Sequence, residues 1–333
     1  MILVGNAGSE HIGSHLNKAA EELGVTAKFF DTSEAFSAFP LIMRLNWWLR
    51  GHRPTRLVEF SREILRACRA LQPKWILSTG IAPIEASVLT EIGKLGILRL
   101  NYLTDDPWNA AHRASWFDQS LPCYDQVFSV RKSNIADLKT QGRFHISYLP
   151  FAYAAGLHYP ESFVTEDERA YFACDVVFVG GADRDRLPYI KALLETGLRI
   201  GLYGNYWERF SETKAYTRGL VQADKLRKAI GGAKVALCLV RRANRDGNSM
   251  RTFEIPAIGS CMLTEDTGEH REIFGKEGEA VVYFRSIPEM LKKLYWLLDH
   301  DEERQRLAKR VHQLITEGHH TYKDRLIRML QQQ

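Results

Sequence analysis

The sequence predicts an α/β protein built from two domains, each with a parallel sheet. Short apolar segments of strand length alternate with longer amphipathic segments of helical period along the 333 residues. The alternation stops between Pro150 and about Arg169 and then starts again with the same pattern. A chain of this length also fits two domains better than one. We therefore expect a first domain over residues 1–152 and a second over residues 171–316.

In the first half, the apolar runs are rich in β-branched and aromatic residues, which favour strands. We predict strands at residues 1–4, 27–30, 75–79, 97–103, 126–129 and 145–149. Amphipathic spacing predicts helices at residues 12–23, 57–71, 84–94 and 132–140. Residues 153–170 contain glycine, proline and an acidic run but neither period, so we expect an interdomain linker there.

The second half repeats the pattern. We predict strands at residues 175–179, 200–203, 235–240, 261–264 and 281–284. Helices are predicted at residues 186–196, 222–230, 250–258, 287–298 and 301–316. We expect residues 317–333 to form a C-terminal helix that packs back on the first domain. Ligands of open parallel sheets bind outside the carboxyl ends of the strands, so two such domains should face each other across a cleft.

Composition and charge exclude several classes of protein. A chain with 45% hydrophobic and 26% charged residues is globular, neither disordered nor collagen-like. The net charge of +5 is spread along the chain, which predicts an anionic small ligand or acceptor and no nucleic acid partner. The start of the chain has no basic segment followed by a long apolar run, so we predict no signal peptide. Five widely spaced cysteines without metal-site spacing predict reduced thiols in a cytoplasmic protein.

The most specific segment follows the predicted strand 235–240. Residues 241–251 contain four arginines and one acid, and Asn248 or Ser249 is a good N-cap for the next helix. Backbone N–H groups, a helix N-terminus and arginines together form an anion site suited to a diphosphate. Glu254, one turn into this helix, would accept hydrogen bonds from the hydroxyls of a ribose or sugar. The alternative is a solvated basic loop with Glu254 as a surface acid.

The same segment carries a family resemblance. Residues 251–265, RTFEIPAIGSCMLTE, resemble the hallmark of CgeB-like (spore-maturation-protein-like) glycosyltransferases of GT-B architecture. Looser agreement, in the same order, is found in LTDDPW at residues 103–108, DVVFVG at 175–180 and YGNYW at 203–207, and in the tail from Tyr283 to Arg325. The resemblance covers about residues 75–330. It implies the GT-B fold, in which two Rossmann-like domains face each other across an interdomain cleft.

The resemblance also implies roles for single residues. Glu254 would contact the nucleotide ribose, and Asn248 and Arg251 would lie at the phosphates or the donor sugar. The chain departs from the wider retaining GT-B pattern at one position, because Asp246 stands where a second glutamate precedes the helix glutamate by eight residues. Pro256 should also shorten or kink the helix. GT-B enzymes stabilise the leaving diphosphate with a helix dipole and basic residues, so no metal is expected.

Two further loops are candidates for the donor. In GT-B enzymes the loop after the first strand of the second domain commonly offers a basic residue to the diphosphate. Gly180 would allow close approach there, and Arg184 or Arg186 would match the basic residue; the alternative is a plain turn with solvated charges. Of the residues that end the next strand, Tyr203, Gly204 and Trp207, the two aromatics would flank the nucleobase or, alternatively, pack against the neighbouring helix.

In the first domain, the loop with Gly8, Glu10 and His11 follows the first strand but matches neither GxGxxG nor a P-loop. Glu10 or His11 would serve as a general base or acceptor contact, and the alternative is a solvated loop. Asp105 and Asp106 end the predicted strand 97–103, where α/β sites are built. Repulsion between these adjacent carboxylates should raise one pKa, so that one acts as a base or binds acceptor hydroxyls; two acids before a proline also fit a plain turn.

Residues 36–53 are dense in aromatics with interleaved arginines. We favour a core-facing helix with exposed basic residues for this segment. The alternative is contact with a membrane interface or an amphipathic acceptor.

The sequence thus predicts a glycosyltransferase of hexosyltransferase type, slightly favouring retention of configuration. It would use a nucleotide-sugar, a UDP-sugar by default, with no further cofactor. The acceptor would be a glycan, a protein or a small molecule, with peripheral membrane or envelope-assembly association as a further option. A non-catalytic nucleotide-sugar or polysaccharide-binding protein is the alternative. The missing GxGxxG disfavours an NAD-dependent enzyme.

Overall fold

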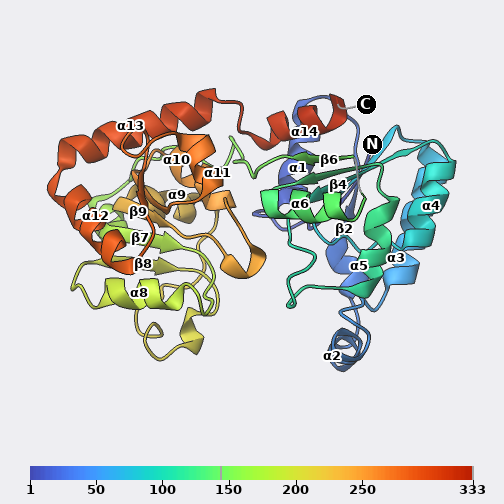
Figure 1. The fold of residues 1–333 in the computed structure, drawn as a ribbon, viewed down its shortest axis with the longest axis horizontal. Helices are drawn as coiled ribbons and strands as arrows, with labels where there is room; N and C mark the ends of the chain where they lie inside the picture. The colour runs from blue at the N-terminus through green and yellow to red at the C-terminus, as the bar shows by residue number, and fades with distance from the viewer. Residues whose placement is uncertain (143–144, 332–333) are drawn as a thin grey trace. The chain divides into compact units, whose positions relative to one another are not determined.

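A computed structural model describes residues 1–142 and 145–331 of the chain. The chain divides into two compact units (Figure 1). The first unit comprises Met1–Pro150, Ala243–Arg245 and Tyr322–Gln333, and the second comprises Phe151–Arg242 and Asp246–Thr321. Each unit is an α/β domain of its own, and each is described separately below.

The first unit contains a six-stranded sheet in which all neighbouring strands are parallel. Its strands are β1 (Ile2–Gly5), β2 (Lys28–Asp31), β3 (Trp75–Thr79), β4 (Leu98–Leu103), β5 (Gln126–Ser129) and β6 (Ile146–Tyr148). Their order in the sheet is β2-β1-β3-β4-β5-β6. The chain runs from β1 to β2 at one edge and then returns to β3 on the other side of β1. The point between β1 and β3 is therefore a topological switch point.

The helices of the first unit connect these strands and cover the sheet (Figure 1). They are α1 (Ile12–Glu22), α2 (Pro40–Leu49), α3 (Leu57–Leu71), α4 (Ala86–Lys94), α5 (Ser115–Ser120), α6 (Lys132–Thr140) and α14 (Tyr322–Gln331). Helix α3 shows why such segments fold: Phe60, Ile64 and Ala67 recur at helical spacing and are buried against the strands. Helix α14 packs on α1, where the Tyr322 ring stacks on His15 at 4.9 Å between ring centres.

The second unit contains a five-stranded parallel sheet with the order β11-β10-β9-β7-β8. Its strands are β7 (Cys174–Val179), β8 (Ile200–Tyr203), β9 (Ala233–Cys238), β10 (Met262–Glu265) and β11 (Val282–Phe284). The central strands are apolar on both faces, as expected for a sheet covered by helices on both sides. The chain leaves β7 for the edge strand β8 and returns to β9 beside β7. The switch point of this unit therefore lies between β7 and β9.

The helices of the second unit surround this sheet (Figure 1). They are α7 (Glu166–Phe172), α8 (Leu187–Leu194), α9 (Ala223–Gly231), α10 (Met250–Ile258), α11 (Gly268–Phe274), α12 (Ile287–Asp299) and α13 (Asp301–Glu317). One core cluster joins the strands to α8, α12 and α13 through buried residues such as Ile190, Leu237, Leu294 and Leu307. Helix α10 continues through Pro256 to Ile258, so the proline does not end it.

Each predicted strand is present within two residues of its expected ends. The helices that sequence reasoning missed are short: α5, α7 and α11 have 6, 7 and 7 residues, too few to show an amphipathic period. Helix α7 begins at Glu166, capped by Thr165, inside the segment expected to be a linker. Residues 332–333 of the predicted C-terminal helix lie outside the described residues.

The prediction of a core-facing helix in residues 36–53 is wrong. A helix, α2, forms over Pro40–Leu49, but none of its residues is buried. Proline at the first position of the helix and the apolar side chains are compatible with a helix, which forms as predicted. The predicted burial of that helix is what the structure contradicts. Apolar residues at helical spacing identify a face but not what covers it.

No helix within residues 1–142 and 145–331 is long and apolar enough to cross a bilayer. Within the same ranges, no three His, Cys, Asp or Glu side chains are grouped as a metal ion requires. The five cysteines are free thiols.

Candidate functional site

The carboxyl ends of β7, β8, β9 and β10 lie along one edge of the second unit's sheet. The loops that leave these strands contain the donor residues predicted from the sequence: Gly180, Arg184, Arg186, Tyr203, Gly204, Trp207, Asn248, Arg251 and Glu254. The strand order places the switch point between β7 and β9 within this group. Open α/β sheets bind ligands at such a point.

Helix α10 starts in a capping box. The Ser249 side chain accepts from the backbone of Thr252, and Ser249 N donates to Thr252 Oγ1 at 2.9 Å. This cap fixes the first turn, which carries Arg251 and, three residues later, Glu254. The two side chains form an ion pair, and Arg251 Nε also donates to the carbonyl oxygen of Val179 at 3.1 Å. Arg251 therefore connects the end of β7 with the start of α10, directly at the switch point.

Glu254 is buried, with 1% of its surface exposed, so the alternative of a surface acid is wrong. Besides Arg251, it faces His158, whose Nε2 lies 3.7 Å from Glu254 Oε1. The backbone N–H of Ala154 donates to His158 Nδ1 at 3.0 Å, which leaves the proton of a neutral ring on Nε2, toward Glu254. A carboxylate buried beside two cationic or donor groups is held in one orientation. Sequence reasoning missed His158, because it lies in the segment taken as a linker.

Asn248 is fully buried and its amide is used within the protein. The side-chain N–H of Asn248 donates to Glu269, and its oxygen accepts from Phe151 N at 3.3 Å. Thr267 Oγ1 donates to the carbonyl oxygen of Gly247 at 2.5 Å. The loop before α10 is thus held by the loop after β10. In this structure the Asn248 side chain holds that loop in place. The family resemblance instead places Asn248 at the phosphates or the donor sugar.

Polar residues at and after the end of β10 also contact the loop that follows β9. Glu265 accepts from Val240 N at 2.7 Å and from Arg242 at 3.1 Å. His270 lies between Thr252, at 3.0 Å, and Thr264, at 3.1 Å, and it is fully buried. Burial lowers the pKa of His270 to about 4, so the ring is neutral at pH 7. Glu265 directly follows the predicted strand 261–264, and this position at the carboxyl end of a strand is the sequence signal that points to it.

Arg186 is occupied by the protein itself. Its guanidinium donates to the carbonyl oxygens of Gly181, at 3.1 Å, and Leu239, at 3.0 Å. It therefore ties the loop after β7 to the loop after β9, and burial lowers its pKa. Arg184 is exposed, and half-buried Arg241 lies 3.9 Å from Asp183. Of the two candidates from the sequence, Arg184 is accessible to an anion and Arg186 supports the edge.

The aromatics after β8 belong to the core. Tyr203 and Trp207 are 1% and 0% exposed, and Trp207 Nε1 donates to the carbonyl oxygen of Gly180 at 2.8 Å. Both rings therefore pack inside the protein, which was the alternative to contact with a nucleobase. Gly204 lets this loop approach β7: its φ is +135°, and a Cβ there would lie 2.1 Å from the Gly180 oxygen. Tyr206, next to Trp207 in this loop, is exposed, with the Arg209 guanidinium 4.0 Å from its ring centre.

In the first unit, the loop after β1 forms a hydrogen-bonded turn. Asn6 Oδ1 accepts from Gly8 N at 2.8 Å, and the Gly8 oxygen accepts from His11 N at 2.9 Å. His11 is exposed and stands at the N-cap of α1 without capping it through its side chain, while Glu10 is half-buried beside it. This loop lies at the switch point between β1 and β3, where an acceptor contact was expected.

Asp105 and Asp106 differ in their surroundings. Asp105 is half-buried at the end of β4, with its carboxylate over Gly80, where a Cβ would come within 2.5 Å of Oδ2. Asp106 is 1% exposed and accepts from Arg245 at 2.7 Å and from Asn134 at 3.0 Å. Burial by itself raises the pKa of Asp106, but these hydrogen bonds and that from Trp108 N bring the pKa below its ordinary value.

The expectation that repulsion raises the pKa is therefore wrong for Asp106. The reason is that Arg245, part of the first unit, neutralises it. Asp106 supports the loop, whereas Asp105 remains half-open at the edge of the sheet.

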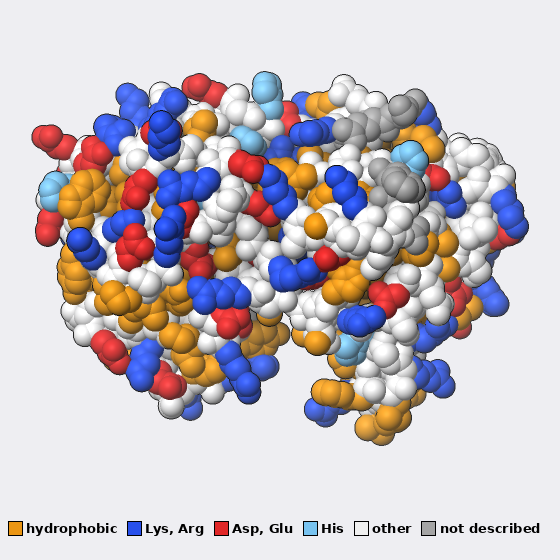
Figure 2. Space-filling view, in the orientation of Figure 1, with side chains coloured by type: hydrophobic (Ala, Val, Ile, Leu, Met, Phe, Trp, Pro, Cys, Tyr) orange, Lys and Arg blue, Asp and Glu red, His pale blue; other side chains and the backbone are white. Residues whose placement is uncertain are grey.

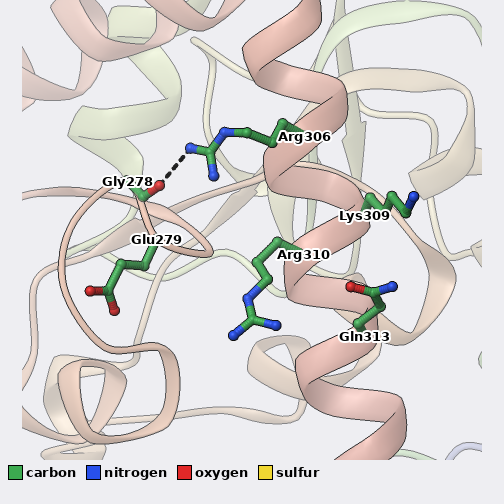
Figure 3. A pocket seen from close by; sticks show the side chains of 6 residues that line it. All are labelled: Gly278, Glu279, Arg306, Lys309, Arg310 and Gln313. Carbon is green, nitrogen blue, oxygen red and sulfur yellow. Dashed lines mark hydrogen bonds between the residues drawn. The ribbon is translucent and has the colours of Figure 1, made fainter.

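Two surface pockets lie away from these edges. One, of about 510 Å³, lies between α13 and the loop before β11, and Figure 3 shows its side chains. It is lined by Gly278, Glu279, Arg306, Lys309, Arg310 and Gln313. The other, of about 670 Å³, includes the first residues of β4, β5 and β6, Leu98, Gln126 and Ile146. Both lie at the amino ends of strands, opposite to the edge where parallel sheets bind ligands.

Comparisons with known proteins agree with this geometry. The model of a family described as "Glycosyl transferase-like" matches residues 186–331. No curated protein matches the sequence. Among solved structures, sucrose-phosphate synthase from Thermosynechococcus elongatus is similar, with 14% identity, a TM-score of 0.70, and coverage of 99% of this chain and 97% of that one. The lipopolysaccharide outer core galactosyltransferase WaaB has 10% identity, a TM-score of 0.62, and coverage of 98% and 97%. A complex of S. aureus MnaA with UDP has 10% identity, a TM-score of 0.56, and coverage of 98% and 94%.

At such identities the structures show the fold, and the family model covers residues 186–331 of it. The predicted fold of two Rossmann-like domains is confirmed, whereas the CgeB-like subfamily stays a prediction. The chain has the two-domain GT-B fold, and its residues 186–331 match the model of a family described as "Glycosyl transferase-like".

Proposed function

We propose that this chain is a glycosyltransferase that takes a sugar from a nucleotide-diphosphate donor bound at the switch point of the second unit. The observation that carries the proposal is the Arg251–Glu254 pair on the first turns of α10, tied to the end of β7. It brings a carboxylate, a guanidinium and a helix N-terminus together where α/β sheets bind nucleotides. Arg184 and Arg241 add cations at the same edge.

The proposed roles follow from charge. Negative charge develops on the leaving nucleotide during glycosyl transfer, and the α10 N-terminus with Arg184, Arg241 and Arg251 would stabilise it. Glu254 would accept hydrogen bonds from the ribose hydroxyls, with His158 keeping its carboxylate in place. The exposed Tyr206 replaces Tyr203 and Trp207 as the aromatic that we assign to the nucleobase.

The acceptor is assigned to the first unit. Asp105 and His11 lie in loops at the carboxyl ends of its strands and keep accessible polar atoms. One of them would bind an acceptor hydroxyl or remove its proton. Hexosyl transfer with retention of configuration and a UDP-sugar as donor are the specific forms we propose, on the resemblance of residues 251–265.

A thermal-shift screen of the full chain with UDP, GDP, TDP and CMP tests the donor site. A ligand that binds only the native state raises the melting temperature, and at 100 times its Kd it adds about 2.7 kcal/mol. We expect one nucleotide diphosphate to raise the melting temperature of the wild type. The shift should be absent in Glu254→Gln and in Arg251→Ala, and unchanged in the exposed control Glu195→Gln. No shift with any nucleotide would contradict the donor site.

Turnover is measured separately, as release of free nucleotide from UDP-sugars. We expect slow release by the wild type even without an acceptor, because water can replace it. Binding of nucleotide-sugars without any release, with or without glycan acceptors, would instead support the non-catalytic alternative.

A further inference from the structure

Helix α2 exposes the apolar face that an ordinary surface helix buries. Seven large apolar side chains, on the helix and at its N-cap residue Phe39, are 36% to 78% exposed. They are Phe39, Leu41, Ile42, Leu45, Trp47, Trp48 and Leu49. Leu41, Leu45 and Trp48 are spaced by four and three residues, so they lie on one side of the helix. A contiguous apolar patch of this kind on a protein surface marks an interaction site.

The charges around this face have one sign. Residues 35–58 contain four arginines, Arg44, Arg50, Arg53 and Arg56, and no acid. Arg53 pairs with Glu85 at 3.0 Å and Arg56 with Glu63 at 3.7 Å, both outside the segment. Arg44 and Arg50, on the helix and at its end, are exposed and have no acidic partner among the described residues. Figure 2 shows hydrophobic side chains with basic ones beside them at the lower end of the first unit, where Figure 1 labels α2.

The rest of the first unit holds α2 at its base. Asn46 Nδ2 donates to Thr55 Oγ1 at 3.2 Å. His52 Nδ1 lies 2.7 Å from the oxygen of Arg113, and the His52 oxygen accepts from Trp116 Nε1 at 3.2 Å. The two chain segments are joined where Arg56 N donates to the oxygen of Ala35 at 2.9 Å. The exposure of the apolar face is therefore built into the fold.

We propose that α2 docks on an anionic lipid surface. Its apolar face would enter the boundary between headgroups and acyl chains, where tryptophan is favoured. Arg44 and Arg50 would stay at the level of the phosphates, their stems along the apolar layer. A second copy of the chain fits less well, because a two-fold contact through this face would bring arginines against arginines without a compensating acid. The proposal is independent of the donor site.

Co-sedimentation of the full chain with lipid vesicles tests it. We expect binding to vesicles of 70% phosphatidylcholine and 30% phosphatidylglycerol, and much weaker binding to pure phosphatidylcholine. Leu45→Gln with Trp48→Gln should lower the partition coefficient at least about tenfold, since it removes two inserted apolar side chains. Arg44→Gln with Arg50→Gln should lower binding to the anionic vesicles by about fivefold for each arginine.

The matched control is Leu71→Gln with Trp296→Gln, which removes one exposed leucine and one exposed tryptophan elsewhere. It should bind vesicles as the wild type does. All variants should keep the wild-type melting temperature, because the changed side chains are exposed. Brominated lipid should quench part of the tryptophan fluorescence of the wild type and less of it in Trp48→Phe.

Three results would overturn the proposal. One is no binding to anionic vesicles, and another is equal binding of the wild type and the Leu45→Gln, Trp48→Gln variant. The third, from light scattering, is a wild-type dimer that this variant converts to a monomer without any binding to vesicles. In that case a second copy covers the face.

Discussion

The carboxyl edges of the two sheets share a topology and differ in their side chains. In the first unit the switch point lies between β1 and β3, and in the second between β7 and β9. The first edge offers the half-buried Asp105 and the exposed His11. The second offers the cations Arg184, Arg241 and Arg251. The same backbone plan therefore presents a carboxylate and a histidine at one carboxyl edge and arginines at the other.

This difference is the basis of the substrate assignment that we propose. The second edge would stabilise an anionic diphosphate, and the first would take a neutral acceptor with hydroxyl groups. On the second edge, Glu254 pairs with Arg251 and Glu265 with Arg242, so these two pairs carry no net charge. Arg184 and Arg241 are cations of the same edge outside these pairs. Variants matched between the two edges can break this comparison or sharpen it.

The largest effect is expected at the closest backbone approach. Gly204→Ala places a Cβ 2.1 Å from the Gly180 oxygen at a φ of +135°, and neither backbone segment can give way. We expect a loss of about 4 kcal/mol, from backbone strain and overpacking together. Gly80→Ala, in the first unit, meets the carboxylate of Asp105 and the Thr104 hydroxyl, side-chain ends that can move, so about 1–2 kcal/mol is expected there. Urea unfolding measures both.

Gly231→Ala is the control, because nothing lies within 4 Å of the added Cβ. It should change the free energy of unfolding by less than about 1 kcal/mol. A smaller loss of stability for Gly204→Ala than for Gly80→Ala would contradict the close approach between Gly204, after β8, and Gly180, after β7.

The second prediction separates the two edges by function. Glu254→Gln should raise the Kd for UDP at least about tenfold, since a hydrogen bond to a charged acceptor is lost. Asp105→Asn should leave that Kd within twofold of the wild type and lower the turnover by about a hundredfold. Calorimetry and nucleotide release measure the two quantities. If Asp105→Asn weakens UDP binding as much as Glu254→Gln does, the division of roles is wrong.

The third prediction concerns one buried histidine in each unit. Burial lowers the pKa of His15 and of His270 to about 4. Because the unfolded chain titrates near 6.5, it binds more protons than the folded protein below that pH, and stability falls as the pH drops from about 6.5 to 4. We expect each histidine to cost about 2 kcal/mol at pH 5 relative to pH 7.

Urea titrations at pH 7 and pH 5 measure this loss. His15→Gln should reduce it by about half, because only His270 then titrates. An unchanged loss in this variant would show that other groups cause the acid sensitivity.

The smallest effect is expected for an exposed cation. Arg184→Ala should raise the Kd for UDP by about threefold at low salt and by less at high salt, because exposed charges are screened. Arg310→Ala, in the pocket of Figure 3, is the matched control and should not change this Kd. Equal effects of the two variants would mean that net charge, and not the β7 loop, attracts the nucleotide.

Much of the fold could be predicted from the sequence, because strands such as β3 and β9 contain apolar runs, at residues 75–77 and 235–238, whose burial needs no knowledge of their neighbours. The site was harder. Arg251 and Glu254 were found from the helix start, whereas the partner His158 lies about a hundred residues away in a segment without a recognisable pattern. Nothing in the spacing distinguished Arg184 from Arg186, since exposure depends on which carbonyl oxygens lie nearby.

The sequence by itself determined the alternation of strands and helices, the arginine-rich loop 241–251 and the apolar residues of α2. These are local properties, fixed by the order of side chains and their periods. Only the tertiary structure decided that β7 and β9 are neighbours, that Trp207 is in the core and that α2 has no cover. Burial and pairing depend on residues far apart in the chain, so the same side chain can be a ligand contact, a support or part of the core.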